Sequence, residues 1–349
     1  MDRNPILSLN LWLIRKSRCP HVHGRFAVDA LPMVKTRGGQ ALAAILVRHY
    51  QEYLRGTRDP DVRFRDFHNH VIHVSGDDWG GATRTAKQWF DRAVGYLRKS
   101  QFAEAAHAAG VLCHYFTDPM TPLHTDHDDQ EKCLHRPIEW SIRCGYDEIK
   151  RLWDEDHLRV VFDMSDRSDW LGEAMRGAAR HSHRYYQPIL DTYDSRIAVS
   201  DPAAALSYVA KHSLAEVFGL AITGWARVLE RMAARTEKRR REPLPHPTSL
   251  GSSLNVAGGL PMGLLHSFRS RFRGHSGVRE LLDEYHENGV VKHNLPTEVD
   301  IVHRVVKVHR RELSWRDRRI ERQNIIRFVP KEDLAEVPQE SEPITRRAA

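Results

Sequence analysis

The sequence predicts an all-α protein built as a multi-helix bundle. Apolar residues recur at helical spacing in several long runs, and no run alternates polar and apolar residues as a half-buried strand does. Capping residues and prolines mark the ends of these runs. With 349 residues, 41% of them apolar and 28% charged, the chain has room for one large domain and a smaller one.

The first half of the chain contains three expected helices, at residues 38–53, 82–99 and 102–117. The last of these is almost entirely apolar, which predicts a buried helix. Because the residue before a proline is pushed out of the α region, Pro119 should end this helix near Asp118.

Three further helices are expected downstream. Pro137 is assigned to the first turn of a helix that runs to Asp154, where the missing N–H of proline is tolerated. Residues 166–193 and 201–235 are expected to form two long helices, the second with Pro202 in its first turn.

Composition suggests where the domains begin and end. Residues 1–242 form the expected helical domain, and residues 243–277 are rich in Pro, Gly and Ser, as a linker would be. Residues 278–330 form a small accessory segment with a possible helix at 299–313 and no recognisable chemistry. Residues 331–349 have the composition of a disordered tail.

The net charge of +7 and the pI of about 9.3 suggest anionic partners such as phospholipid headgroups or nucleic acid, although solubility explains them equally well. No segment approaches the ~18 apolar residues of a membrane span. The short apolar run at residues 6–14 lacks a small-residue cleavage site, which favours a cytoplasmic location. The four cysteines show no paired spacing and are expected to be reduced.

One segment, HYFTDPMTPLHTDHDDQEKCLHRPIE, contains the candidate chemistry. His114 and Asp118 are four residues apart, so they share a helix face, and His135 and Glu139 repeat this spacing. Between the pairs, a Pro-Leu-His turn presents His124. A single His–acid pair is usually a surface ion pair, but two pairs around this turn favour a metal site. Zinc accepts such ligands, and the absence of a CxxC pair favours a catalytic site over a structural one.

The pattern His-Tyr-x-x-Asp-x-x-x-Pro-Leu-His followed by His-x-x-x-Glu resembles the signature of the bacterial zinc-dependent phospholipases C, whose fold is shared with the single-strand-specific zinc nucleases. The resemblance extends from about residue 20 to residue 235. It implies a helical domain that holds up to three zinc ions and hydrolyses phosphodiesters. It also implies that Asp118 bridges two metals, that His114 joins one of them, and that the remaining ligands of the motif hold another: His124, His135 and Glu139.

The resemblance implies further ligands upstream, an Asp and a His. Asp61, in a Pro-Asp step, is the candidate carboxylate that binds metal or accepts a proton from water. His70 is the candidate imidazole, because bulky apolar residues follow it as they do in the family. The sequence leaves four alternatives open: Asp59, Asp66, His73 and His68.

Secreted members of the family also bind zinc through an N-terminal Trp and a nearby His. Trp12 would serve in this way only if the chain were cut before it. His21 and His23 are at a suitable distance to supply the imidazole. Two zinc ions are therefore expected, and a third depends on these N-terminal residues.

Three functions are compatible with this pattern. The first is a phospholipase C that hydrolyses the phosphodiester of a phospholipid, with possible peripheral contact to a membrane. The second is a single-strand nuclease on the same metal site, which would need aromatic side chains on which bases can stack. The third is a non-catalytic module whose metals are structural or partly lost.

Overall fold

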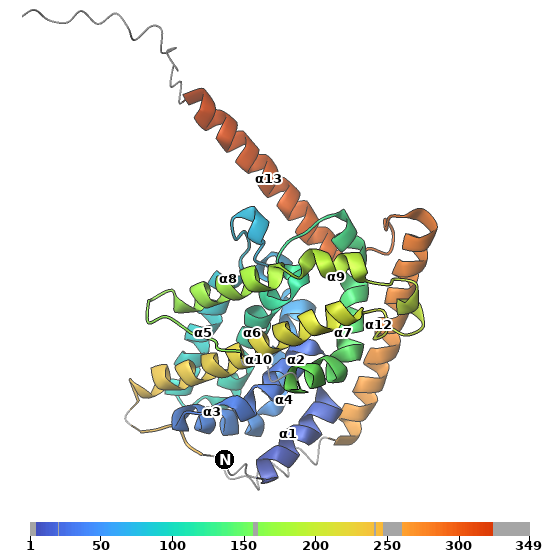
Figure 1. The fold of residues 1–349 in the computed structure, drawn as a ribbon. Helices are drawn as coiled ribbons and strands as arrows, with labels where there is room; N and C mark the ends of the chain where they lie inside the picture. The colour runs from blue at the N-terminus through green and yellow to red at the C-terminus, as the bar shows by residue number, and fades with distance from the viewer. Residues whose placement is uncertain (1–4, 20, 156–159, 241, 247–259, 324–349) are drawn as a thin grey trace, which may run out of the picture. The chain divides into compact units, whose positions relative to one another are not determined.

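The computed structural model describes residues 5–19, 21–155, 160–240, 242–246 and 260–323. In these ranges the regular elements are helices, with one isolated β-bridge, and the all-α prediction is confirmed (Figure 1). The α-helices are α1 (Pro5–Arg18), α2 (Val22–Asp29), α3 (Arg37–Arg48), α4 (Tyr50–Gly56), α5 (Ala82–Arg98), α6 (Phe102–Thr117), α7 (Asp129–Glu155), α8 (Trp170–His183), α9 (Tyr186–Thr192), α10 (Tyr208–Glu237), α12 (Leu260–Asn288) and α13 (Thr297–Gln323).

Helix α6 packs against α4 and α5, and α10 packs against α3, α5 and α7 (Figure 1). As the apolar sequence of α6 predicts, its residues from Gly110 to Thr117 are all buried. The helix ends at Thr117, and Asp118 follows as its C-cap, where Pro119 was expected to stop it. The core therefore holds the end of α6, with its candidate ligands, in a fixed place.

Two glycines allow α4 and α6 to approach closely. A Cβ atom at Gly110 would lie 2.0 Å from the carbonyl oxygen of Tyr53, and one at Gly56 would lie 2.2 Å from the carbonyl oxygen of His107. Neither carbonyl is the end of a flexible side chain, so the backbones themselves would have to separate. The contact also places the backbone of Thr57 against Gly110, one helical turn before His114.

Replacing Gly110 with Ala should destabilise the protein, because the added methyl group overlaps backbone atoms. We expect the free energy of unfolding to fall by about 1–3 kcal/mol or more. Gly95 on α5 is a matched control, since a Cβ atom there meets nothing within 4 Å. Gly95→Ala should raise the free energy of unfolding by about 0.5–1 kcal/mol through helix propensity and backbone entropy. Denaturant unfolding of both variants checks this, and equal stability of the two would contradict it.

Several predicted helix boundaries are wrong. Pro137 was expected in a first turn, but it lies inside α7, which begins two turns earlier. The Asp128 side chain accepts a hydrogen bond from the backbone N–H of Glu131 at 2.7 Å and so caps the helix at this earlier point. The helix continues through Pro137, so His135 and Glu139 are on one helix as their spacing predicted.

The other long helices also differ from their predicted ranges. The segment 166–193 forms α8 and α9 instead of one helix, since Pro188 cannot donate to the helical ladder. Helix α10 begins after Ser207, whose side chain accepts from the N–H of Ala210, so Pro202 lies outside it. Residues 38–53 form α3 and α4 with a break at His49.

The helices near the C-terminus cross the expected domain boundaries. Helix α12 begins at Leu260, inside the stretch 243–277 that was expected to be a linker, and its Val278, Leu281 and Leu282 join the core of the helical domain. One compact unit extends from Met1 to His303, and the second begins at Arg304 within α13. Residues 247–259, in the expected linker, and 331–349, the expected tail, lie outside the described residues. None of the described helices combines the length and apolar character needed to cross a bilayer.

Candidate metal centre

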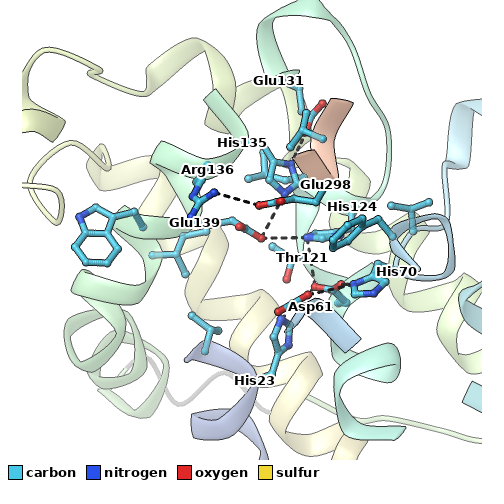
Figure 2. Close-up of a pocket in the computed structure, with 18 of the residues that line it drawn as sticks. His23, Asp61, His70, Thr121, His124, Glu131, His135, Arg136, Glu139 and Glu298 are labelled. Carbon is cyan, nitrogen blue, oxygen red and sulfur yellow. Dashed lines mark hydrogen bonds and ion pairs between the residues drawn. The ribbon is translucent and has the colours of Figure 1, made fainter. Parts of the chain in front are cut away.

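Eight imidazole and carboxylate side chains converge on one space. Figure 2 shows His23, Asp61, His70, His124, His135 and Glu139 among them. The eight include all seven residues that the sequence proposed as ligands, together with His23. The contributing side chains are His23 of α2, Asp61 of the π-helical turn Pro60–Phe64, His70 after the turn Phe67–Asn69, His114 at the end of α6, Asp118 directly after it, His124 of the turn Pro122–His124, and His135 and Glu139 of α7.

These side chains form three groups whose potential ligand atoms lie within 4.8 Å of one another. The groups are His23, His114 and Asp118; Asp61, His70 and His114; and His124, His135 and Glu139. Each combines imidazole nitrogens with at least one carboxylate oxygen, which suits zinc and related divalent metals.

Asp118 is positioned between the groups. Its Oδ1 lies 3.2 Å from Nε2 of His23 and 3.3 Å from Nε2 of His124. Its Oδ2 lies 2.8 Å from Nδ1 of His70 and 3.5 Å from Nε2 of His114. Each oxygen of one carboxylate therefore faces two imidazoles, which is the arrangement that a bridging ligand requires.

Hydrogen bonds fix which nitrogen of two imidazoles is available. Nδ1 of His114 donates to the carbonyl oxygen of Thr57 at 2.9 Å. Nδ1 of His23 lies 2.9 Å from the hydroxyl of Thr117, which itself donates to the carbonyl of Cys113 at 2.8 Å and so accepts from the imidazole. In both residues Nε2 is therefore the nitrogen that can offer a lone pair to a metal beside Asp118 once it gives up any proton.

His135 is oriented in the same way by a carboxylate. Its Nδ1 hydrogen-bonds to Oε1 of Glu131, and its Nε2 lies 3.4 Å from Oε1 of Glu139. The same oxygen of Glu139 lies 3.2 Å from Nε2 of His124. Glu131 was not among the predicted site residues, although it precedes His135 by one helical turn, the spacing that could have indicated it.

The three candidate upstream acids, Asp61, Asp59 and Asp66, face different partners in the structure. Oδ1 of Asp61 lies 3.3 Å from Nε2 of His114. Asp59 turns away and pairs with Nε2 of His107 at 2.8 Å. Asp66 lies 3.6 Å from Nε2 of His70, on the side of that ring away from Asp118, so it can orient His70 but does not join a ligand group.

The alternative histidines, His73, His21 and His68, lie outside the three ligand groups. His73 stacks on His127, and burial is the main reason that its pKa falls to about 3. His21 lines the same cavity but belongs to none of the three groups, and neither does His68. Trp12 is exposed on α1.

The imidazoles and carboxylates of the centre face one another and shift one another's pKa values. Burial raises the pKa of Asp118, but the charges of His124 and His114 outweigh it, and the pKa lies well below its ordinary value. Burial lowers the pKa of His135, yet Glu139 and Glu131 raise it well above the ordinary value. The pKa of His114 is also raised well above its ordinary value, by Asp61 and Asp118 against the effect of burial.

These shifts predict a pH dependence of metal binding. Because the pKa values of His70, His114 and His135 are raised, a metal must compete with protons for these imidazoles. Asp118 and Glu139, whose pKa values are lowered, are already ionised and release none. We expect zinc binding to release protons and the affinity to rise with pH. Calorimetry in buffers of different ionisation enthalpy measures the release, and binding without proton release would contradict the prediction.

The centre borders a cavity of about 430 Å³. The side chains of Asp61 and Glu139 are 49% and 43% exposed, so the ligand cluster is open on their side. Apolar residues form part of the cavity wall, among them Val62, Phe67, Val71, Leu123, Val278, Val299 and Val302.

Comparisons with protein-family models, with curated proteins and with solved structures found no match for this chain. The likeness to the zinc-dependent phospholipases C therefore depends on the motif from His114 to Glu139. The structure itself shows an all-α architecture and side chains that could hold a metal ion.

Proposed function

We propose that the protein is a zinc-dependent phosphodiester hydrolase of the phospholipase C type. The main support is the placement of Asp118, whose two oxygens face imidazoles from all three ligand groups beside an open cavity. The cluster is also open to the cavity through the partly exposed side chains of Asp61 and Glu139, which leaves room for water or substrate, as a catalytic zinc site needs.

Zinc ions held by these groups would supply positive charge for the phosphoryl oxygens and lower the pKa of a bound water. Asp61 is the candidate acceptor for the proton of the attacking water, because its carboxylate is half exposed at the open side and lies within 3.3 Å of Nε2 of His114. His114 and His70 hold that carboxylate in place.

A phospholipid substrate is favoured over a nucleic acid by the wall of the cavity. A base-binding site needs exposed aromatic faces for stacking. The Phe and Trp residues that line this cavity are all buried, namely Phe26, Phe67, Trp140 and Phe218. By contrast Val62 is 56% exposed at the cavity, which suits an acyl chain or the glycerol end of a lipid.

Hydrolysis assays on the zinc-loaded protein test this proposal. We expect release of phosphocholine from a soluble phosphatidylcholine analogue and little cleavage of single-stranded DNA. Cleavage of DNA without lipid hydrolysis would favour the nuclease. Retention of zinc with neither activity would overturn the enzymatic proposal and favour a non-catalytic metal module.

A further inference from the structure

A buried carboxylate connects the metal centre to the C-terminal helix. Glu131 of α7 is only 3% exposed. One of its oxygens accepts a hydrogen bond from Nδ1 of His135, and the other lies 3.3 Å from Nε2 of His303 on α13. Both oxygens of Glu131 therefore face imidazoles. One belongs to the candidate ligand His135, and the other belongs to His303, on a helix for which the sequence analysis predicted no role in the site.

The first turns of α13 contact α7 at a second place. Glu298 pairs with Arg136 at 3.4 Å beside the cavity (Figure 2). Val299 is buried, and both it and Val302 line the cavity, so this segment forms part of its wall. The side chain of His303 is 14% exposed, which limits competition from water for its bond to Glu131.

We propose that Glu131 and His303 are positioning residues for the metal held by His124, His135 and Glu139. Glu131 accepts a hydrogen bond from Nδ1–H of His135 and thereby keeps Nε2 as the nitrogen that faces Glu139. His303 donates to the other oxygen of Glu131 and prevents the carboxylate from rotating away.

This role follows from how imidazole ligands are oriented in metal sites. The hydrogen bond on the second nitrogen sets both the tautomer and the ring angle, and losing it typically costs 10- to 100-fold in metal affinity. His303 acts one step further out, through Glu131. The inference rests on metal binding by this group, which is part of the proposed function, but it does not depend on hydrolysis.

Metal affinity of the full-length protein tests the inference, with zinc measured against a competing chelator. The variant His135→Ala identifies which binding step belongs to this group. His303→Ala should weaken the same step by about 10-fold and leave the other steps unchanged. His303→Gln should recover most of the affinity, because the side-chain amide can still donate to Glu131.

A double-mutant cycle separates positioning from packing. If His303 acts through Glu131, then His303→Ala should cause no further loss in a Glu131→Gln background. Glu298→Gln is a matched control on the same helix, and it should leave zinc affinity unchanged because Glu298 contacts Arg136 and no candidate ligand. Circular dichroism verifies that each variant is folded.

Several results would overturn the inference. These are wild-type affinity in His303→Ala, failure of His303→Gln to restore binding, an additive loss in the double variant, or absence of the step that His135→Ala removes. Zinc binding that follows the expected pattern without any phosphodiesterase activity would leave the inference standing and reject the proposed hydrolase.

Discussion

Replacing Asp118 with Asn is expected to remove most of the bound zinc and nearly all hydrolytic activity. The amide keeps the shape of the carboxylate but loses the negative charge that faces four imidazoles. Because bound metal contributes several kcal/mol of transition-state stabilisation, the rate should fall by about 10³-fold or more. Zinc content by atomic absorption and hydrolysis of the phosphatidylcholine analogue measure the two effects.

Asp126→Asn is a suitable control for this variant. Asp126 lines the same cavity but belongs to none of the ligand groups, and it accepts a hydrogen bond from Ser75 instead. Its replacement should leave the zinc content unchanged. If the zinc content of Asp118→Asn equals that of the wild-type protein, Asp118 does not bridge metals and the central element of the proposal is wrong.

Removing zinc with a chelator is expected to lower the stability of the whole helical domain. The ligand groups tie α2, α6 and α7 together with the loops that carry Asp61, His70 and His124. A metal that binds only the folded state, present at about a thousand times its dissociation constant, adds about 4 kcal/mol to the free energy of unfolding. Thermal or denaturant unfolding with and without chelator measures this difference.

The Asp118→Asn variant provides the internal comparison. Since it should bind little zinc, chelator should change its stability far less than that of the wild-type protein. If the wild-type protein unfolds at the same point in saturating zinc and in chelator, the ligand groups do not hold a metal tightly.

The parts of the fold predicted best were those with local signals. The helix 102–117 was predicted with both ends correct, because a continuous apolar run ends at a proline that forbids its extension. The spacing of His114 to Asp118 and of His135 to Glu139 likewise predicted that each pair would lie together, and the structure brings both pairs to one space.

Helical spacing could not select the upstream residues. The segment 57–81 has no helical period, so only the family resemblance favoured Asp61 over Asp59 and His70 over His73. The structure separates them by the partners they face. Asp59 faces His107 and His73 stacks on His127, whereas Asp61 and His70 face His114.

The role of the C-terminal segment was missed for a similar reason. Glu131 and His303 are 172 residues apart, and a hydrogen bond over this separation leaves no periodic pattern in the sequence. The Pro, Gly and Ser content that suggested a linker gave no indication that a helix starts at Leu260. His303 shares its helix face with Val299 and Val306, both buried, and this was the available hint.

The close approach of α4 and α6 has a chemical consequence beyond stability. Gly110 permits the contact, and one turn later Nδ1–H of His114 donates a hydrogen bond to the carbonyl oxygen of Thr57. If the two backbones were spread apart, that proton could move to the nitrogen facing Asp118, and the imidazole would stop acting as an electron-pair donor. A single methyl group at Gly110, whose nearest neighbours are backbone atoms, could thus abolish coordination by tautomeric exchange, with the full ligand set still in place.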